Sequence, residues 1–202
     1  MKRGLLFVVS GPSGSGKGTI VQKAREKRDF LLSVSATTRA PRKGEEDGVH
    51  YYFISKEDFE SRIAEGRMLE YTRYSGSGQY YGTPKDPVEK ALASGKDVLL
   101  EIEIDGAMQI KKQMPEAILI FVTAPSLELL RARLIGRGSE TEESLENRLM
   151  RAKEELSLAD RYDYLIVNEE GKSDEAVESL LEIARAESMR MERNTEIINS
   201  LI

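Results

Sequence analysis

The fold is decided by a stretch near the N-terminus that reads Leu5-Leu6-Phe7-Val8-Val9-Ser10-Gly11-Pro12-Ser13-Gly14-Ser15-Gly16-Lys17-Gly18-Thr19. A short apolar run leads into a glycine-rich turn, and a helical pattern begins near Thr19. Only glycine readily adopts the backbone angles of such a turn, so the N–H groups of the turn and of the helix N-terminus point into one concavity. The spacing G-x-x-x-x-G-K adds a lysine for the outer phosphates of a polyphosphate. The pattern therefore predicts a phosphate-binding loop.

Composition excludes several kinds of chemistry. The chain has 202 residues, no cysteine and one histidine, His50, so disulfides, thiolate metal sites, a histidine zinc site and a Ser-His-Asp triad are set aside. A net charge of −5 argues against broad binding to nucleic acid. The sequence shows neither a membrane-length apolar run nor a signal peptide, and it suggests no obligate protein partner. We therefore expect a cytoplasmic protein that binds small phosphorylated molecules.

The apolar runs predict a parallel sheet. Runs typical of buried strands lie at 5–9, 30–34, 98–104, 118–122 and 164–167, and helical patterns at 88–93, 107–113, 127–135 and 145–158 separate most of them. This alternation predicts a three-layer α/β fold with a five-stranded parallel core sheet. The tail, 173–202, is predicted to be one amphipathic helix.

Two segments interrupt this alternation of predicted strands and helices. Residues 35–84 are rich in Tyr, Arg, Gly and Thr, with β-like pieces at 51–54 and 69–74 on either side of a helical pattern at 56–65. They predict an inserted mixed α+β subdomain at the ligand-binding edge of the sheet. Residues 136–148 begin with glycines around an arginine and predict a small lid.

Several motifs in order resemble those of guanylate kinase. They are Gly11-Pro-Ser-Gly-x-Gly-Lys17, Ser33-Val-Ser-Ala-Thr-Thr-Arg39-Ala-Pro-Arg42-x-Gly44-Glu45, Gly48-Val-His-Tyr51-Tyr-Phe53, Tyr80-Tyr81-Gly82-Thr83-Pro84, Gly136-Arg137-Gly138, Glu142-Glu143-Ser144 and Ile166-Val-Asn168. The resemblance implies a P-loop nucleoside monophosphate kinase that transfers the terminal phosphoryl group of ATP to GMP with Mg²⁺. It further implies a core with the ATP site at 1–34 and 85–202, a GMP-binding subdomain at 35–84 and the lid at 136–148.

The resemblance also assigns the GMP-binding residues. They are Ser35, Arg39, Arg42, Tyr51 and Tyr81 for the phosphate, Glu70 and Thr83 for the base, and additionally Glu101. Two arginines supply several N–H donors to a phosphate, and hydroxyl groups complete its hydrogen bonds without adding charge. A carboxylate accepts the adjacent N1–H and N2–H₂ donors of guanine, whereas adenine presents an acceptor at N1.

For ATP, the resemblance implies the loop Gly11 to Thr19 together with Arg133, Arg137 and Asn168. The residues implied in catalysis are Lys17, Arg39, Arg42, Arg137 and Arg148. Because Gly18 occupies the position that usually carries a hydroxyl for magnesium, Thr19 has to supply it, directly or through water. Glu101 and Glu103 alternate along the run 98–104, so they are predicted to share one face of a strand and to hold magnesium, directly or through water.

The sequence departs from the family pattern at Ser77-Gly78-Gln79, where the loop is longer by two residues. Two alternatives remain open. One is a monophosphate kinase for another base, which requires that Glu70 does not face the base. The other is a non-catalytic guanylate-kinase-like module that binds a phosphopeptide or protein, against which the intact loop argues.

Overall fold

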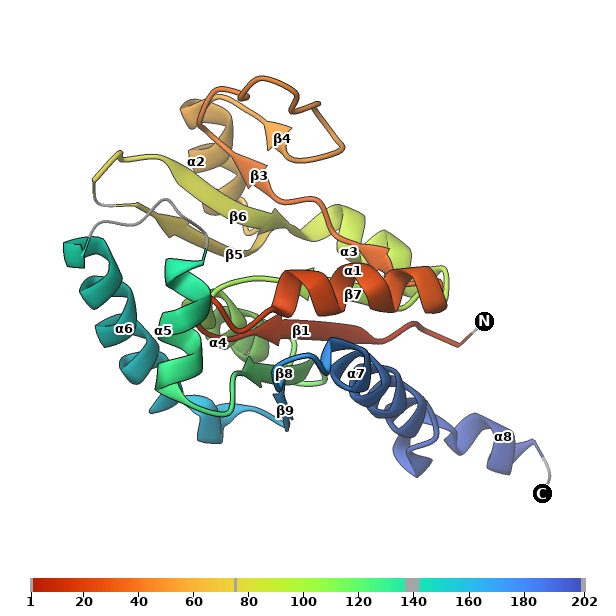
Figure 1. Cartoon of the computed structure of the whole chain (residues 1–202). Coiled ribbons are helices and arrows are strands. Elements are labelled where there is room, and N and C mark those ends of the chain that lie inside the picture. The colour runs from red at the N-terminus through yellow and green to blue at the C-terminus, as the bar shows by residue number, and fades with distance from the viewer. Residues whose placement is uncertain (1, 75, 137–141, 201–202) are drawn as a thin grey trace. The chain divides into compact units, whose positions relative to one another are not determined.

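The computed structural model describes residues 2–74, 76–136 and 142–200, and these divide into two compact units. The first unit comprises residues 1–10 and 29–119, and the second comprises 11–28 and 120–202. Figure 1 shows the course of the chain through both.

The first unit contains two sheets. Its elements are β1 (Leu6–Ser10), β2 (Leu31–Leu32), β3 (Ala36–Thr37), β4 (Tyr52–Phe53), α2 (Lys56–Ala64), β5 (Met68–Arg73), β6 (Tyr80–Pro84), α3 (Lys85–Ala93), β7 (Val98–Glu101) and α4 (Ile104–Gln113). Strand β7 pairs in parallel with β1 and with β2, and α3 and α4 pack against these strands. Every residue of β1 is buried, as expected for a parallel strand covered on both faces.

The second sheet of this unit comes from residues 36–84. Its strand order is β4-β3-β6-β5, with β5 antiparallel to β6 and at one edge. Helix α2 begins at the predicted position, where the Ser55 hydroxyl accepts a hydrogen bond from the N–H of Asp58. Phe59 on α2 stacks on Tyr80 of β6, with ring centroids 5.1 Å apart, so helix and sheet share a small apolar core.

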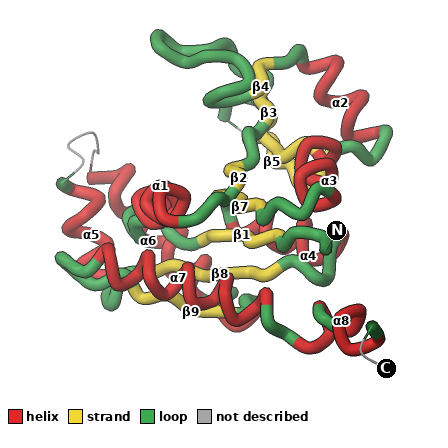
Figure 2. The backbone as a smooth tube through the Cα atoms, turned by 90° about the vertical axis from the view of Figure 1, so that its right-hand side faces the viewer, coloured by secondary structure: helices red, strands yellow, loops and turns green. Residues whose placement is uncertain are grey.

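The second unit joins the glycine-rich turn to the C-terminal helices. Its elements are α1 (Lys17–Lys27), β8 (Ile118–Thr123, which begins in the first unit), α5 (Leu127–Ile135), α6 (Glu142–Leu156), the 3₁₀ turn η1 (Ala159–Arg161), β9 (Tyr164–Val167), α7 (Ser173–Ser188), the 3₁₀ turn η2 (Met191–Arg193) and α8 (Thr195–Asn199). Strands β8 and β9 are parallel, and α7 packs on both α1 and β9 (Figure 2). Among the described residues, the parallel strands predicted for the core are thus β2, β7 and β1 in the first unit and β8 and β9 in the second.

Three predicted elements need correction. The run 30–34 contains a strand of only Leu31–Leu32, because these are the two residues that pair with β7, at Val98 and Leu99. Phe30 before them is buried edge-on against Phe7. The run 98–104 leaves the strand after Glu101, and Glu103 is the N-cap of α4. Glu101 and Glu103 therefore do not alternate along one strand, and the inference of a shared strand face was wrong.

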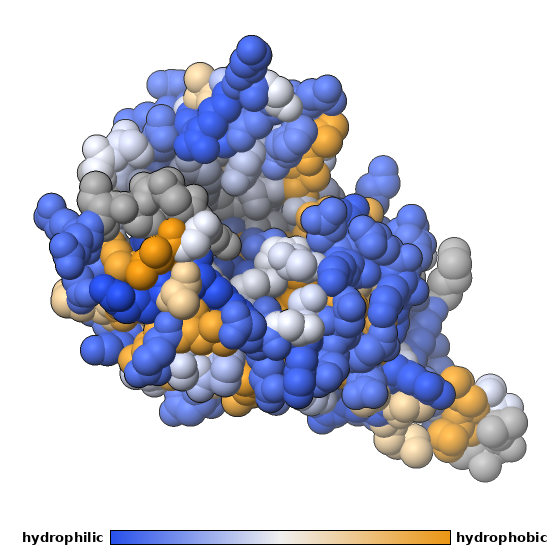
Figure 3. Space-filling model, in the orientation of Figure 1, coloured by the Kyte–Doolittle hydropathy of each residue, from blue (hydrophilic) through white to orange (hydrophobic). Residues whose placement is uncertain are grey.

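The predicted single helix of the tail was also wrong. Helix α7 ends at Ser188, and the chain turns through η2 before α8. The turn is held by Glu187, a buried carboxylate that accepts hydrogen bonds from Tyr164, Arg190 and Arg193. Beyond the turn, Ile197 and Ile198 of α8 are exposed. Figure 3 shows hydrophobic residues on the surface near the C-terminal end of the chain.

The predicted lid lies partly outside the described residues. Residues 137–141 of the segment 136–148 are not described, and the segment continues into α6 from Glu142. The residues that the structure describes contain no helix of the length and apolarity that a membrane span requires.

Candidate functional site

The glycine-rich turn of the second unit has no room for side chains at two positions. Gly11 has φ 146°, and a Cβ there would lie 2.0 Å from the carbonyl oxygen of Val122. Gly16 has φ 88°, and a Cβ there would lie 2.3 Å from the amide nitrogen of Asn168. Both positions therefore require glycine, which brings the loop backbone close to the end of β8 and to the residue after β9.

Helix α1 begins directly after this turn and carries positive charge at its start. Gly16 is the N-cap, so no side chain caps the helix, and the first turn contains no acidic residue. The leading N–H groups of a helix have no acceptor within the helix and carry a partial positive charge. The Lys17 ammonium donates to the Gly11 carbonyl at 3.0 Å and so arches over the loop. This arrangement suits an anion.

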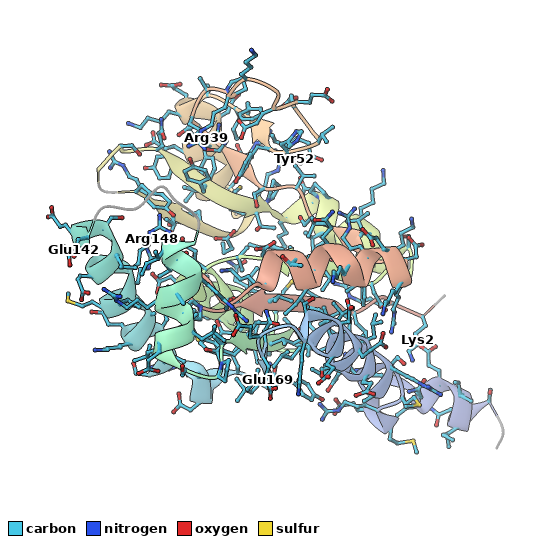
Figure 4. All side chains as sticks on the ribbon, in the orientation of Figure 1. Lys2, Arg39, Tyr52, Glu142, Arg148 and Glu169 are labelled. Atoms are coloured by element: carbon cyan, nitrogen blue, oxygen red, sulfur yellow. The ribbon has the colours of Figure 1, made fainter. Side chains whose placement is uncertain are left out.

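Three side chains brace the loop from elsewhere in the second unit. Asn168 is buried and its Nδ2 donates to the Ser15 carbonyl at 2.8 Å. Arg133 on α5 donates to the Asn168 carbonyl at 2.9 Å and lies 3.5 Å from the carbonyls of Gly14 and Ser15. Arg148 on α6, labelled in Figure 4, donates to the Ser13 hydroxyl at 3.1 Å. The structure thus places all three of these predicted residues at the loop.

Among the other residues predicted for ATP binding, Thr19 and Ser15 are described by the structure and Arg137 is not. Thr19 lies in the first turn of α1 and is exposed. The Ser15 hydroxyl and the Asn168 Oδ1 are buried, and among the described residues neither has a hydrogen-bond partner. Such atoms ordinarily have one, so the Ser15 hydroxyl can still donate to or accept from a ligand, and Asn168 Oδ1 can still accept from one. Arg137, predicted for ATP binding and catalysis, lies outside the described residues.

The first unit contains a cavity of about 370 Å³. Its walls come from the residues directly before β3 and β4, the β5–β6 hairpin, the end of β7 and the start of α4. Six residues predicted from the sequence line it: Ser35, Tyr51, Glu70, Tyr81, Glu101 and Glu103. Segments distant in the sequence therefore meet here, and the volume lies in the range of small-molecule sites.

Glu70 is the buried charge of this cavity. Its side chain is only 7% exposed, and it faces Thr83, its partner on β6, whose hydroxyl donates to Glu70 Oε1 at 2.7 Å. Burial raises the pKa of Glu70 to about 6, and the hydrogen bonds from Thr83 oppose this rise. The residue is thus a desolvated carboxylate that accepts from the hydroxyl and the backbone N–H of Thr83, and its two oxygens have further acceptor capacity for a ligand's donors.

Arg39 lies at a second part of the first unit, after β3 (Figure 4). Its guanidinium is 9% exposed and forms two hydrogen bonds of 2.6 Å with the Glu45 carboxylate. These bonds, together with one from the Arg42 backbone N–H, lower the pKa of Glu45 to about 2. Arg39 Nε is buried and has no partner among the described residues, so it can still donate to an anion. The Arg42 side chain is exposed.

Aromatic rings join these two parts. Arg39 lies over the Tyr51 ring, 5.1 Å from its centroid, and Tyr51 packs edge-on against Tyr81 at 5.9 Å. Tyr81 also packs edge-on against Tyr74, whose hydroxyl donates to Glu103 Oε1 at 2.9 Å. The segment expected to lengthen this loop, 77–79, continues from a turn at 76–77, and Ser77 lines the cavity.

The acidic residues do not form a metal cage. Glu101 and Glu103 are exposed at the cavity, and the described parts of the chain contain no cluster of three His, Cys, Asp or Glu side chains able to hold a metal ion. A cation bound here would need ligands from elsewhere, such as phosphate oxygens and water.

The residues at the site that were not predicted from the sequence include Glu45, Tyr74 and Gly106. Glu45 was quoted within a motif but given no role, and its spacing after Arg39 was the available signal. Tyr74 lines the cavity through the hairpin. Gly106 lines it from α4, where a Cβ would lie 2.8 Å from Glu70 Oε2. A glycine inside a helix is unfavourable by itself, which is the signal that could have identified Gly106.

A glycine loop ending in Lys17 at the start of α1, in an α/β fold with parallel strands, defines the class of P-loop kinases. Shikimate kinase from Bacteroides thetaiotaomicron shares this fold at a TM-score of 0.50 with 12% identity, over 90% of this chain and 98% of that one. A family model described as guanylate kinase matches residues 3–187, and the chain therefore belongs to the guanylate kinase family.

Relatives agree with this assignment. Guanylate kinase of Clostridium tetani is 49% identical over 193 residues, which cover 96% of this chain and 91% of the relative. Guanylate kinase of Streptococcus thermophilus is 50% identical over 194 residues, covering 95% and 91%. A crystal structure of guanylate kinase from Anaplasma phagocytophilum matches with a TM-score of 0.74 and 34% identity, over 95% of this chain and 90% of that one. The predicted fold class and family resemblance are confirmed.

Proposed function

We propose that this chain transfers the γ-phosphoryl group of ATP to GMP, giving ADP and GDP. Family membership supports the reaction, and the observation that supports the acceptor is Glu70, a buried carboxylate in a cavity of nucleoside size. Its second oxygen and the rest of its acceptor capacity match the N1–H and N2–H₂ donors that guanine presents side by side. Adenine would place an acceptor against this carboxylate, and such a mismatch is strongly penalised in a buried site.

The phosphate of GMP is assigned to residues 35–84. Arg39 and Arg42 supply guanidinium donors, and Ser35, Tyr51 and Tyr81 supply hydroxyl groups. The ion pair with Glu45 orients Arg39, and its buried Nε retains one donor. Arginine suits this role because its planar fork binds phosphate oxygens with defined geometry.

The polyphosphate of ATP is assigned to the loop Gly11 to Thr19. Its support is the uncapped start of α1 and the Lys17 ammonium above the loop. Arg133 and Asn168 brace the loop and complete the ATP site, and Arg148 is assigned, with Arg137, to charge neutralisation during transfer.

The reaction needs no general base. The second pKa of a phosphomonoester is near 6, so the GMP phosphate is largely dianionic at neutral pH and attacks without losing a proton. Catalysis then depends on in-line placement of the two nucleotides and on cations that offset the charge of the transferring group. The cations assigned to this role are Lys17, Arg39, Arg42, Arg137 and Arg148.

Magnesium is assigned as the partner of ATP. The absence of an acidic cage among the described residues fits an ion held mainly by substrate phosphates and water, with the Thr19 hydroxyl as a ligand and Glu101 and Glu103 reached through water. When bound, the ion offsets phosphate charge.

A coupled assay that detects ADP, with ATP and magnesium and either GMP, AMP or dTMP as acceptor, tests the proposal. We expect turnover with GMP and about 10²-fold or greater preference over AMP in kcat/KM. Comparable turnover of AMP would refute guanine recognition by Glu70. No turnover with any acceptor, together with binding of GMP, would support the non-catalytic alternative.

A further inference from the structure

Strand β5, which carries Glu70, lies at the edge of its sheet. It pairs with β6 on one side only, and its other edge faces helix α4. An unpaired strand edge leaves backbone N–H and C=O groups that need other partners. Side chains of α4 provide them here.

Gln109 substitutes for a neighbouring strand. Its Oε1 accepts a hydrogen bond from the Tyr71 N–H at 3.1 Å, and its Nε2 donates to the Tyr71 carbonyl at 3.0 Å. One side-chain amide thus binds both backbone groups of the residue that follows Glu70. A primary amide has one acceptor oxygen and an NH₂ donor, so glutamine matches both groups at once.

Gln113 acts on the other side of Glu70, at an irregularity of the strand. The pairing passes from Met68 opposite Pro84 to Glu70 opposite Thr83, so Leu69 is an extra residue in β5. Such a bulge interrupts the ladder and redirects neighbouring side chains. Gln113 Nε2 donates to the Leu69 carbonyl at 2.9 Å and also lies 3.4 Å from the Met68 carbonyl, which fixes the bulge from outside the sheet.

Gly106 completes the same face of α4, one turn before Gln109. A Cβ at this position would lie 2.8 Å from Glu70 Oε2 and 3.3 Å from Glu70 Cγ. The Glu70 carboxylate therefore occupies the space that a side chain at position 106 would need. Residues three and four apart share a helix face, so Gly106, Gln109 and Gln113 form one stripe along β5.

We infer that this stripe of α4 is the positioning element for the guanine-reading carboxylate: Gln109 and Gln113 fix the backbone before and after Glu70, and Gly106 leaves room for its side chain. The inference rests on the proposed function. It makes the three residues determinants of base specificity although none of them needs to touch the base.

The test compares Gln109→Leu, Gln113→Leu and Gly106→Ala with the wild type and with Gln22→Leu, a matched change at an exposed position of α1. The acceptors are GMP and IMP, whose base lacks only the 2-amino group. A displaced carboxylate loses the contact to that group, so the ratio of kcat/KM for GMP to that for IMP reports its position.

For Gln109→Leu we expect kcat/KM for GMP to fall about tenfold and the GMP:IMP ratio to fall with it, while KM for ATP stays within about twofold. Gln113→Leu should have a smaller effect in the same direction, and Gln22→Leu should match the wild type. Gly106→Ala is the sharpest variant, because alanine favours a helix and should leave the urea midpoint of unfolding unchanged or higher while lowering the ratio about tenfold.

A GMP:IMP ratio equal to that of the wild type in both Gln109→Leu and Gly106→Ala would overturn the inference, even if the urea midpoint fell. If Gln109→Leu does not fold, Gly106→Ala alone decides. A wild-type protein without GMP turnover would instead refute the proposed function, so the two failures are distinguishable.

Discussion

In the phosphate loop, residues 11–19 follow one another along the chain, whereas the cavity around Glu70 draws its walls from β5, β6, the end of β7 and α4. The loop offers backbone N–H groups and the start of a helix, with Lys17 as its cation. The cavity depends on side chains, above all on a carboxylate that is 7% exposed. An anion site made of backbone needs no buried ionised side chain, but base recognition buries one at a cost in stability.

Removing the cation of the loop should have the largest effect on activity. For Lys17→Met we expect kcat to fall about 10²- to 10³-fold, because a preorganised charge near the transferring group is lost. Turnover in the coupled assay and GMP binding by calorimetry check this, and GMP binding should persist. Lys27→Met is the control, since Lys27 forms an exposed ion pair with Glu178 on α7. Loss of GMP binding in Lys17→Met would contradict the assignment of GMP to residues of the first unit.

Neutralising the carboxylate of the cavity should lower activity and raise stability together. Glu70→Gln should reduce kcat/KM for GMP about 10²-fold, because the amide group presents a donor toward guanine donors. The pKa of Glu70 is raised from 4.5 to about 6, so its ionised form destabilises the folded state above pH 6. The variant should therefore gain about 2 kcal/mol in free energy of unfolding at pH 7.

That gain should disappear as the pH falls to 4.5, where the carboxyl is protonated in the folded protein. Urea unfolding of the wild type and Glu70→Gln at a series of pH values measures it. An equal difference at every pH would show that desolvation of Glu70 is not the cause.

Weakening the ion pair that supports Arg39 should have the smallest effect on activity. Glu45→Gln weakens the ion pair that orients the guanidinium, and we expect KM for GMP to rise about threefold. The pKa of Glu45 is lowered to about 2, so its contribution to stability is present above pH 4.5 and is lost as the pH falls toward 2. The variant should lose less stability than the wild type over this interval.

Acid unfolding followed by circular dichroism, with Glu46→Gln as an exposed neighbouring control, tests this difference. Identical acid unfolding profiles for Glu45→Gln and the wild type would show that the Glu45 carboxylate does not contribute to the stability of the folded protein.

The elements predicted well from sequence are those whose pattern is local. Helix α5 matches the predicted bounds, and β9 does as well, because apolar spacing and flanking residues mark both ends. The strand predicted for the run 98–104 was too long, because Ile102 and Ile104 continue an alternating pattern beyond Glu101. The pattern does not reveal that Glu103 is the residue before the first turn of α4, where Ile104 is buried as part of a helix.

The prediction of one helix for the tail was wrong for a different reason. Helical spacing continues past Ser188, but the buried Glu187 binds Arg193 and Tyr164, which fixes a turn there. A contact between residues 23 positions apart, such as Tyr164 with Glu187, leaves no signal in a local pattern. Propensity is a weak prior, and tertiary contacts override it.

The sequence by itself determined the phosphate loop, the α/β class and the family, because glycine positions, apolar spacing and ordered motifs are local and act through the backbone. Only the tertiary structure decided that Arg39 is paired with Glu45, that burial raises the pKa of Glu70, and that Gly106, Gln109 and Gln113 lie along its strand. Burial and hydrogen-bond partners depend on which distant segments meet, and therefore they exist only once the chain has folded.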